Sequence, residues 1–272
     1  KDCGRVQFIN LLMEKEREIK ELKKQLKEIN TFINNSGFAN IEQVMLDFYA
    51  KMSQQKEFIK YLENEIMPRN DLNDEGHNRE HVNYVRRRSK KFASNIDGIN
   101  MDMVDTIAVY HDVGHSIDAK NHEKVSASIL ASDKNLREFF SEEEIKVMAE
   151  AVEDHRASKN SEPRSIYGRI VSSADRNTSV DQVLKRTYSY RLKHMPDASI
   201  DEIIEESRKH AIDKFGVEGY AVDKMYFSDD EYEVFLKKIQ ELAGDLEGFR
   251  RRYIEVNEIN FSRVRKAKEP LN

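Results

Sequence analysis

The chain has 272 residues, with 45 Lys and Arg against 50 Asp and Glu, so its formal net charge at pH 7 is −5. A hydrophobic share of 39% supports a folded core and excludes disorder throughout. No apolar run approaches the roughly 20 residues that cross a bilayer. The mild acidity also argues against general coating of nucleic acid.

The single cysteine excludes an intramolecular disulfide framework and any zinc site built from cysteines. No signal-peptide pattern opens the chain, so we expect a cytoplasmic protein with no membrane partner. Because the chain begins with Lys rather than Met, we also expect it to be a piece of a longer chain.

Helical periodicity dominates the sequence. Only 4 Pro and 10 Gly are present, fewer than strands joined by tight turns would need. Apolar residues recur at intervals of three and four rather than two. The pattern predicts an all-α fold with three parts: a helical region over residues 1–70, a core over 71–195, and a C-terminal helical segment over 196–272 that packs on the core.

The first helix is expected at about residues 5–34. From Ile19 onward its apolar residues alternate at steps of three and four, which makes two short heptads: Ile19, Leu22, Leu26, Ile29 and Ile33. These heptads fit a coiled coil that forms a homodimer, and they fit a helix packed on its own chain equally well. A break at residues 34–37 and a second helix follow. The polar stretch at 68–76 is the predicted domain boundary.

Seven further helices are predicted, at about 78–94, 101–113, 121–132, 141–156, 165–193, 199–215 and 230–256. Ser141 and Glu144 form a capping box at the start of the fourth of these. The basic run at 86–91 is interpreted as a mainly solvated face. The basic tract at 185–193, which contains two tyrosines, is interpreted as packing rather than as a platform for a nucleotide base.

Six of the eight histidines lie between His77 and His155. Five predicted helices each turn a metal-capable side chain toward their apolar face: His81, His111 with Asp112, His122, His155 and Asp175. One buried histidine is usually a hydrogen-bonded core residue, whereas a buried carboxylate needs a partner or a metal. Several imidazoles and two carboxylates in one helical core predict a divalent-metal centre.

Three of these segments resemble the H…HD…D signature of the HD-domain metal-dependent phosphohydrolases. They are His81 in Glu80-His81-Val82-Asn83-Tyr84-Val85, the doublet in Tyr110-His111-Asp112-Val113-Gly114-His115, and Asp175 in Ser173-Ala174-Asp175-Arg176. The resemblance covers about residues 76–180. It implies an HD-domain-like helical bundle with the site at the centre of its helices, preceded here by the N-terminal helical extension.

His122 and His155 fall where two-metal members of that superfamily carry further histidines. The resemblance therefore implies two divalent ions (Mn, Fe, Ni, Co, Zn or Mg). His81, His111, Asp112 and Asp175 would hold one ion, and His122 and His155 the other, with Asp112 bridging. The chain lacks the His-His pair and Gly-Tyr-Pro element of the cyclic-dinucleotide phosphodiesterases and the Glu-Asp motif of the guanosine-tetraphosphate hydrolases.

The expected activity is hydrolysis of a phosphomonoester or phosphodiester in a nucleotide or small phosphorylated metabolite, through a metal-activated hydroxide. Asp112 and His115 are the predicted catalytic residues; His115 either donates a proton or binds phosphate, or it only supports the ligands. His77, one turn before His81, is expected to be an exposed loop residue, with a role as an extra ligand as the alternative. The predicted phosphate-binding residues are Arg156, Arg164 and Arg176.

Two other functions remain open from the sequence. A branch of HD proteins uses the same six-ligand pattern for a mixed-valent di-iron centre that oxidises C–H bonds. A metal-binding regulatory module, dimerised through the N-terminal helices, is the third alternative, although the full ligand set argues against it.

Overall fold

The computed structural model describes residues 20–29, 31, 41–74, 76–159 and 161–259. All regular secondary structure within these ranges is helical, which confirms the predicted all-α fold. The chain divides into two compact units, residues 1–59 and 60–272. No helix within the described ranges is both long enough and apolar enough to span a membrane.

The first unit contains a helical stretch at residues 20–29 and most of α2 (Ile41–Tyr61). Its described helices carry exposed apolar side chains: Leu22, Leu26, Leu46 and Tyr49 are each more than half exposed. The remainder of the predicted first helix, and the predicted break at 34–37, lie outside the described residues. Coiled-coil dimerisation therefore stays a prediction.

The second unit begins with the last two residues of α2, and the helix continues beyond them in a wider turn. A π-helical turn, η2 (Leu62–Ile66), leads directly into the short α3 (Met67–Asn70). Pro68 does not break this continuation, because it lies in the first turn of α3, where a missing backbone N–H costs little. The predicted boundary stretch thus starts inside a helix.

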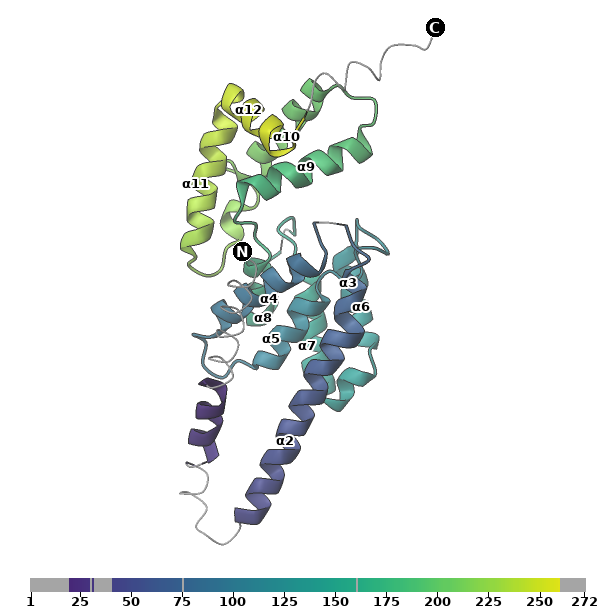
Figure 1. Cartoon of the computed structure of the whole chain (residues 1–272), viewed down its shortest axis with the longest axis vertical. Helices are drawn as coiled ribbons and strands as arrows, with labels where there is room; N and C mark the ends of the chain where they lie inside the picture. The colour runs from purple at the N-terminus through teal and green to yellow at the C-terminus, as the bar shows by residue number, and fades with distance from the viewer. Residues whose placement is uncertain (1–19, 30, 32–40, 75, 160, 260–272) are drawn as a thin grey trace, which may run out of the picture. The chain divides into compact units, whose positions relative to one another are not determined.

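Five helices surround one apolar core in the next part of this unit (Figure 1): α4 (Arg79–Ala93), α5 (Met101–Tyr110), α6 (His122–Ser132), α7 (Glu142–Glu153) and α8 (Ile166–Ala174). A short 3-10 helix, η3 (Asn135–Glu138), joins α6 to α7. The core includes Val85, Ile107 and Val152, each at most 2% exposed. The predicted capping box of Ser141 and Glu144 is confirmed at the start of α7.

Two predicted long helices are wrong, because polar side chains end them locally. The one expected at 165–193 is two helices, α8 and α9 (Val180–His194), and Ser179 caps the second by accepting from the backbone N–H of Gln182. The one expected at 230–256 is α11 (Asp230–Gly244) and α12 (Leu246–Val256). Asp245 separates them and accepts from the N–H of Gly248.

A second apolar core holds the C-terminal helices together. α9, α10 (Ile200–Phe215), α11 and α12 pack around Leu184, Ile203, Phe235 and Tyr253, with the short η4 (Val222–Lys224) between α10 and α11. Because Leu184 belongs to α9, this core begins before residue 196. It supplies a rigid support for side chains that α9 and α10 carry.

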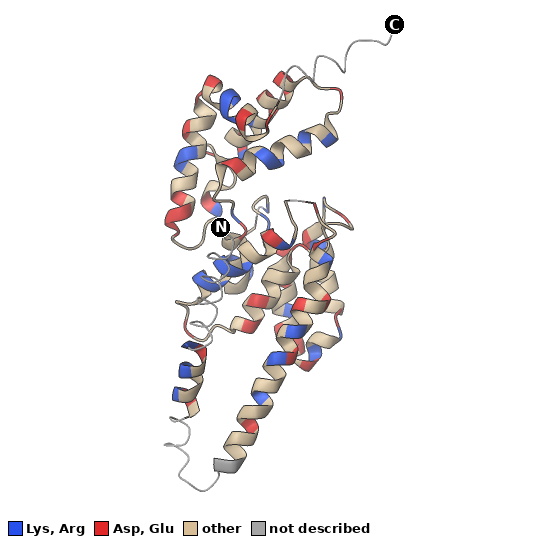
Figure 2. Ribbon diagram, viewed as in Figure 1, with Lys and Arg blue, Asp and Glu red and all other residues tan. Residues whose placement is uncertain are grey.

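Several basic residues lie along α4 (Figure 2), and two of them, Arg88 and Lys91, connect the two cores by pairing with Asp229. Arg88 is buried and donates to Asp229 Oδ2 at 2.5 Å and to the carbonyl oxygen of Ala174 at 3.1 Å. Arg86 pairs with Asp105 and Glu63. The solvated-face interpretation is therefore wrong for Arg86 and Arg88.

Candidate metal centre

The six predicted ligands converge near the ends of five helices. His81 lies in the first turn of α4 and His122 starts α6, whereas His111, His155 and Asp175 lie at or just beyond the C-terminal ends of α5, α7 and α8. Asp112 follows His111. Helical periodicity placed these residues on apolar faces, and the structure adds that the helix ends meet.

Asp112 lies between two pairs of imidazoles. Its Oδ2 is 3.0 Å from His111 Nε2 and 3.4 Å from His81 Nε2, and its Oδ1 is 3.3 Å from His122 Nε2 and 3.6 Å from His155 Nε2. Asp175 Oδ1 is 3.0 Å from His81 Nε2. All six side chains therefore offer donor atoms to one small volume.

Backbone carbonyls set the orientation of three of the histidines. Nδ1 of His111, His122 and His155 lies 2.7, 3.0 and 2.7 Å from the carbonyl oxygen three residues earlier. Because a carbonyl oxygen only accepts, each Nδ1 carries a proton, and in the neutral imidazole Nε2 presents its lone pair inward. The Nε2 atoms of His122 and His155 are 3.2 Å apart. This arrangement suits a cation between them.

Asp112 Oδ1 gives the strongest indication that these side chains bind a cation. The atom is buried and has no hydrogen-bond partner among the described residues. Burial opposes ionisation of Asp112, but the adjacent His111 and His81 hold the pKa of its carboxyl well below the usual range. A buried carboxylate oxygen without a partner is costly, and metal coordination is one of the few ways to satisfy it. The donor set therefore fits divalent metal.

Comparison with known families agrees with this geometry. Residues 78–178, which include all six converging side chains, match the sequence profile of the HD domain. The chain contains an HD domain. Most members of this superfamily are metal-dependent hydrolases, which fits the donor set described above. Searches of curated proteins and of solved structures found no match to the chain.

The glycine of the HD motif, Gly114, is required by close packing. A Cβ at this position would lie 2.8 Å from the backbone nitrogen of Ser126 and from Val125 Cβ, and the Gly114 N–H donates to Ser126 Oγ at 2.9 Å. The motif loop thus contacts α6, the helix that begins with His122. Any side chain at Gly114 would move His122 relative to Asp112.

Gly114→Ala should therefore lower both stability and metal affinity. Overpacking of this kind costs about 1–3 kcal/mol, and the displaced α6 should weaken metal binding at least tenfold. Denaturant unfolding and equilibrium dialysis measure the two effects. Gly244→Ala is the matched control, because a Cβ at Gly244 meets nothing within 4 Å. Equal metal affinity in Gly114→Ala and the original chain would contradict this account.

We call the six converging side chains the HD centre: His81, His111, Asp112, His122, His155 and Asp175. His81 differs from the other three histidines of this centre. Its Nδ1 lies 3.2 Å from Arg186 Nη2, a donor that also bonds the carbonyl oxygen of Gly76. Arg186 comes from α9, outside the family match, and was not among the predicted site residues. The only available signal was its membership of a basic tract. No helical spacing could show that α9 brings this guanidinium to His81.

The three predicted phosphate-binding arginines all have partners within the protein. Arg164 bonds both carboxylate oxygens of Asp154 and so fixes the segment after His155. Arg176 is buried and donates to Ser172 Oγ at 2.6 Å and to the His155 carbonyl oxygen at 3.4 Å. Arg156, about one-third exposed, donates to Lys120 O and Glu123. Substrate binding by the three stays a prediction.

His115 lies beside the six converging residues and not among them. Its ring stacks on His77 with centroids 3.8 Å apart, and its centroid is 5.2 Å from that of His122. Burial and the nearby His77 lower the pKa of His115 to about 4. His115 is therefore a neutral imidazole at pH 7, and its catalytic role stays a prediction.

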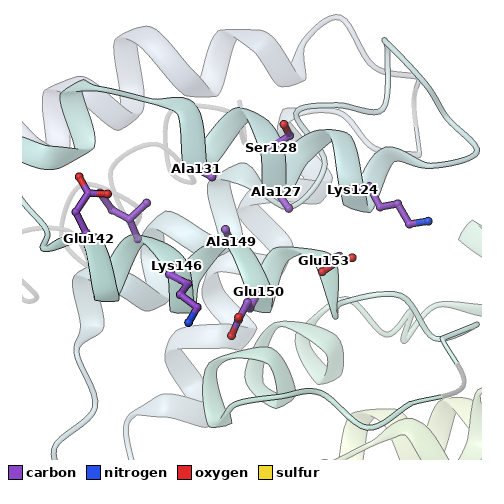
Figure 3. A pocket seen from close by; sticks show the side chains of 10 residues that line it. Lys124, Ala127, Ser128, Ala131, Glu142, Lys146, Ala149, Glu150 and Glu153 are labelled. Carbon is purple, nitrogen blue, oxygen red and sulfur yellow. The ribbon is translucent and has the colours of Figure 1, made fainter.

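One pocket of the described residues lies away from the HD centre. It is a groove of about 490 Å³ between α6 and α7 whose lining includes Lys124, Ala127, Lys146 and Glu150 (Figure 3), and it contains none of the six converging residues. A second pocket, of about 200 Å³, is lined by Glu123, Lys124, Glu153, Arg156, Ser158 and Lys159. Two residues that line this second pocket, Glu123 and Arg156, directly follow His122 and His155 in the sequence.

Proton release should accompany metal binding to the metal-free protein. Burial would lower the pKa of His111, but the adjacent Asp112 outweighs it and raises the pKa to about 9. His111 therefore holds a second proton below that pH, and an incoming cation must displace it. We expect the apparent metal affinity to rise about tenfold per pH unit up to pH 9 and then to level. Calorimetry in buffers of different ionisation enthalpy measures the released proton; a pH-independent affinity would contradict the prediction.

Proposed function

We propose that the protein is a metal-dependent phosphohydrolase that cleaves a phosphomonoester or phosphodiester in a nucleotide or other small phosphorylated metabolite of the cytoplasm. The observation that carries the proposal is the convergence of four imidazoles and two carboxylates on one volume, with a buried oxygen of Asp112 that has no hydrogen-bond partner among the described residues. The HD domain supports the same reaction class.

The side chains divide into two groups around Asp112. His81, His111, Asp112 and Asp175 would hold one ion, and His122 and His155 would hold a second on the opposite carboxylate oxygen. When bound, divalent ions lower the pKa of a coordinated water from 15.7 toward about 7 and stabilise charge on phosphate oxygens. The backbone carbonyls that hold three of the imidazoles keep these donors in place before any ion arrives.

Cationic side chains near the HD centre favour an anionic substrate. Arg186 reaches His81 from α9, and Arg156 lines the pocket next to His155. Burial and the neighbouring Arg176 lower the pKa of Lys214, on α10, to about 8. A phosphate placed among these groups would relieve their mutual repulsion. Arg186 and Lys214 are thus further candidates for phosphate binding, beside the three predicted arginines.

The cationic surroundings also separate the proposal from its alternatives. A mixed-valent di-iron oxygenase would use the same six ligands, but its chemistry does not by itself require several cations near the HD centre. A regulatory module that had lost its activity would be expected to lose part of the ligand set, whereas all six residues lie together here.

The test is release of phosphate or nucleotide from a panel of mono-, tri- and cyclic nucleotides by the Mn²⁺-loaded chain. We expect release from at least one substrate, and its loss in Asp112→Ala. If no substrate of the panel is hydrolysed, and the purified protein contains iron and consumes O₂, the protein is instead a di-iron oxygenase. If no substrate is hydrolysed, and the protein binds metal tightly but consumes no O₂, the regulatory module is favoured.

A further inference from the structure

A second cluster of metal-capable side chains lies next to the HD centre. Asp74, His77 and His115 each offer a donor atom within 4.8 Å of the others. His77 Nδ1 is 2.7 Å from Asp74 Oδ1, and His115 Nε2 is 4.0 Å from Asp74 Oδ2. Asp74 and His77 precede the family match, so the HD signature does not include them.

The loop that carries Asp74 and His77 is held against the HD motif. Asn73 Nδ2 donates to the carbonyl oxygens of both His77 and Asp112 at 2.9 Å, and Asn73 Oδ1 accepts from the Ser116 N–H. The Gly76 N–H donates to Asp74 Oδ1 at 2.9 Å. These bonds position Asp74 and His77 opposite His115 with no ligand present, so the donor atoms are preorganised.

The ring nitrogens of His115 have no hydrogen-bond partner in the described part of the chain. Its Nε2 is too far from Asp74 for a hydrogen bond, and no described residue hydrogen-bonds either of its nitrogens. The ring is mostly buried, with a side-chain exposure of 10%, and it stacks on His77 at an interplanar angle of 19°. The two stacked imidazoles and the carboxylate thus supply two nitrogen donors and one oxygen donor within 4.8 Å of one another.

We propose that Asp74, His77 and His115 bind a further divalent cation, separate from those of the HD centre. Two nitrogen donors and one carboxylate suit Zn, Mn, Fe, Co or Ni, whereas Mg and Ca prefer all-oxygen sites. Three protein donors leave coordination positions for water or a substrate oxygen. The side chain of Asp74 is 61% exposed, so an ion reaches the site from solvent.

The position of this outer site links it to the HD centre. The His77 ring lies 5.9 Å from that of His81 and 6.0 Å from that of His122, and the His115 ring lies 5.2 Å from that of His122. An ion in the outer site would face the same substrate volume as the HD centre. The site itself does not depend on which reaction that centre performs.

The test counts cobalt ions bound by the full chain, because Co²⁺ suits this donor set and its visible spectrum reports coordination. The chain is stripped of metal, dialysed against Co²⁺ and analysed by mass spectrometry. His77→Gln should bind one ion fewer than the original chain. His194→Gln is the matched control, since His194 lies at the exposed end of α9 and stacks only on Tyr190. Asp112→Asn should keep the ion that depends on His77.

Equal cobalt content in the original chain and His77→Gln would overturn the proposal. A His77-dependent ion that disappears in Asp112→Asn would also overturn it, because that ion would belong to the HD centre. The comparison of His77→Gln with the original chain tests the proposal even if Asp112→Asn folds poorly. His77 lies in a partly exposed loop, so we expect His77→Gln to fold. Neither result depends on hydrolytic activity, so failure of this proposal is distinguishable from failure of the proposed function.

Discussion

Asp112→Asn should remove the ions of the HD centre and lower kcat/KM by about 10³-fold or more, a loss of at least about 4 kcal/mol of transition-state stabilisation. Asp112 is the residue that faces both pairs of imidazoles, with Oδ2 toward His111 and Oδ1 toward His122. An amide has the same shape but carries no charge, and only one of its two terminal atoms can coordinate a cation. Metal analysis and steady-state kinetics on the same preparation measure both effects.

Asp105→Asn is the matched control for Asp112→Asn. Asp105 is also a buried aspartate of the α5 segment, but it pairs with Arg86 and Lys90 and does not face the HD centre. We expect it to lower stability while leaving the metal content unchanged. Full metal content and activity in Asp112→Asn would contradict the assignment of Asp112 as the shared ligand.

Arg88→Met should destabilise the second unit by about 3–5 kcal/mol, because it leaves the buried carboxylate of Asp229 without its principal partner. Arg88 and Asp229 are almost fully buried, at 5% and 0% side-chain exposure. A loss of this size lowers the melting temperature by roughly 10 °C in a domain of about 200 residues. Thermal and denaturant unfolding measure it.

Two further variants test the cause of that loss. Lys91→Met removes the second cation on Asp229 but leaves Arg88, and because Lys91 is half exposed we expect a cost below about 1 kcal/mol. Arg88→Met combined with Asp229→Leu removes both charges and should recover part of the stability. A loss below about 1 kcal/mol in Arg88→Met alone would show that the pair does not join the two cores.

The sequence alone predicted the features that depend on a single helix. The spacing of His81, His111, His122, His155 and Asp175 relative to apolar residues predicted that all five face a core, because residues three and four apart share a helical face. The capping box at Ser141 is a similar local signal. The HD signature then indicated how these faces combine.

Contacts between distant segments could not be predicted from one sequence. Arg186 reaches His81 across 105 residues, and Arg88 reaches Asp229 across 141 residues. Periodicity assigns a charged residue to a solvated face unless its partner is known, so the run containing Arg88 was interpreted wrongly. His77 lies in a loop with its side chain 29% exposed, and its contact with His115 depends on how that loop folds back, which one sequence does not reveal.

The two missed helix breaks had weak local signals. Ser179 and Asp245 are residue types that favour helix N-caps, and each lies three positions before the backbone N–H that it accepts from. Apolar periodicity continues through both points, because the following helix also packs on a core. The break after α8 matters for function, since it places Asp175 at a helix end beside His81.

The most direct test of the metal centre is anomalous diffraction from crystals of the full chain grown with Mn²⁺. The account predicts a peak among Asp112, His111 and His81, and a second between Asp112 and the pair His122 and His155. An ordered cluster with no anomalous peak at Asp112 in the presence of excess Mn²⁺ would contradict it.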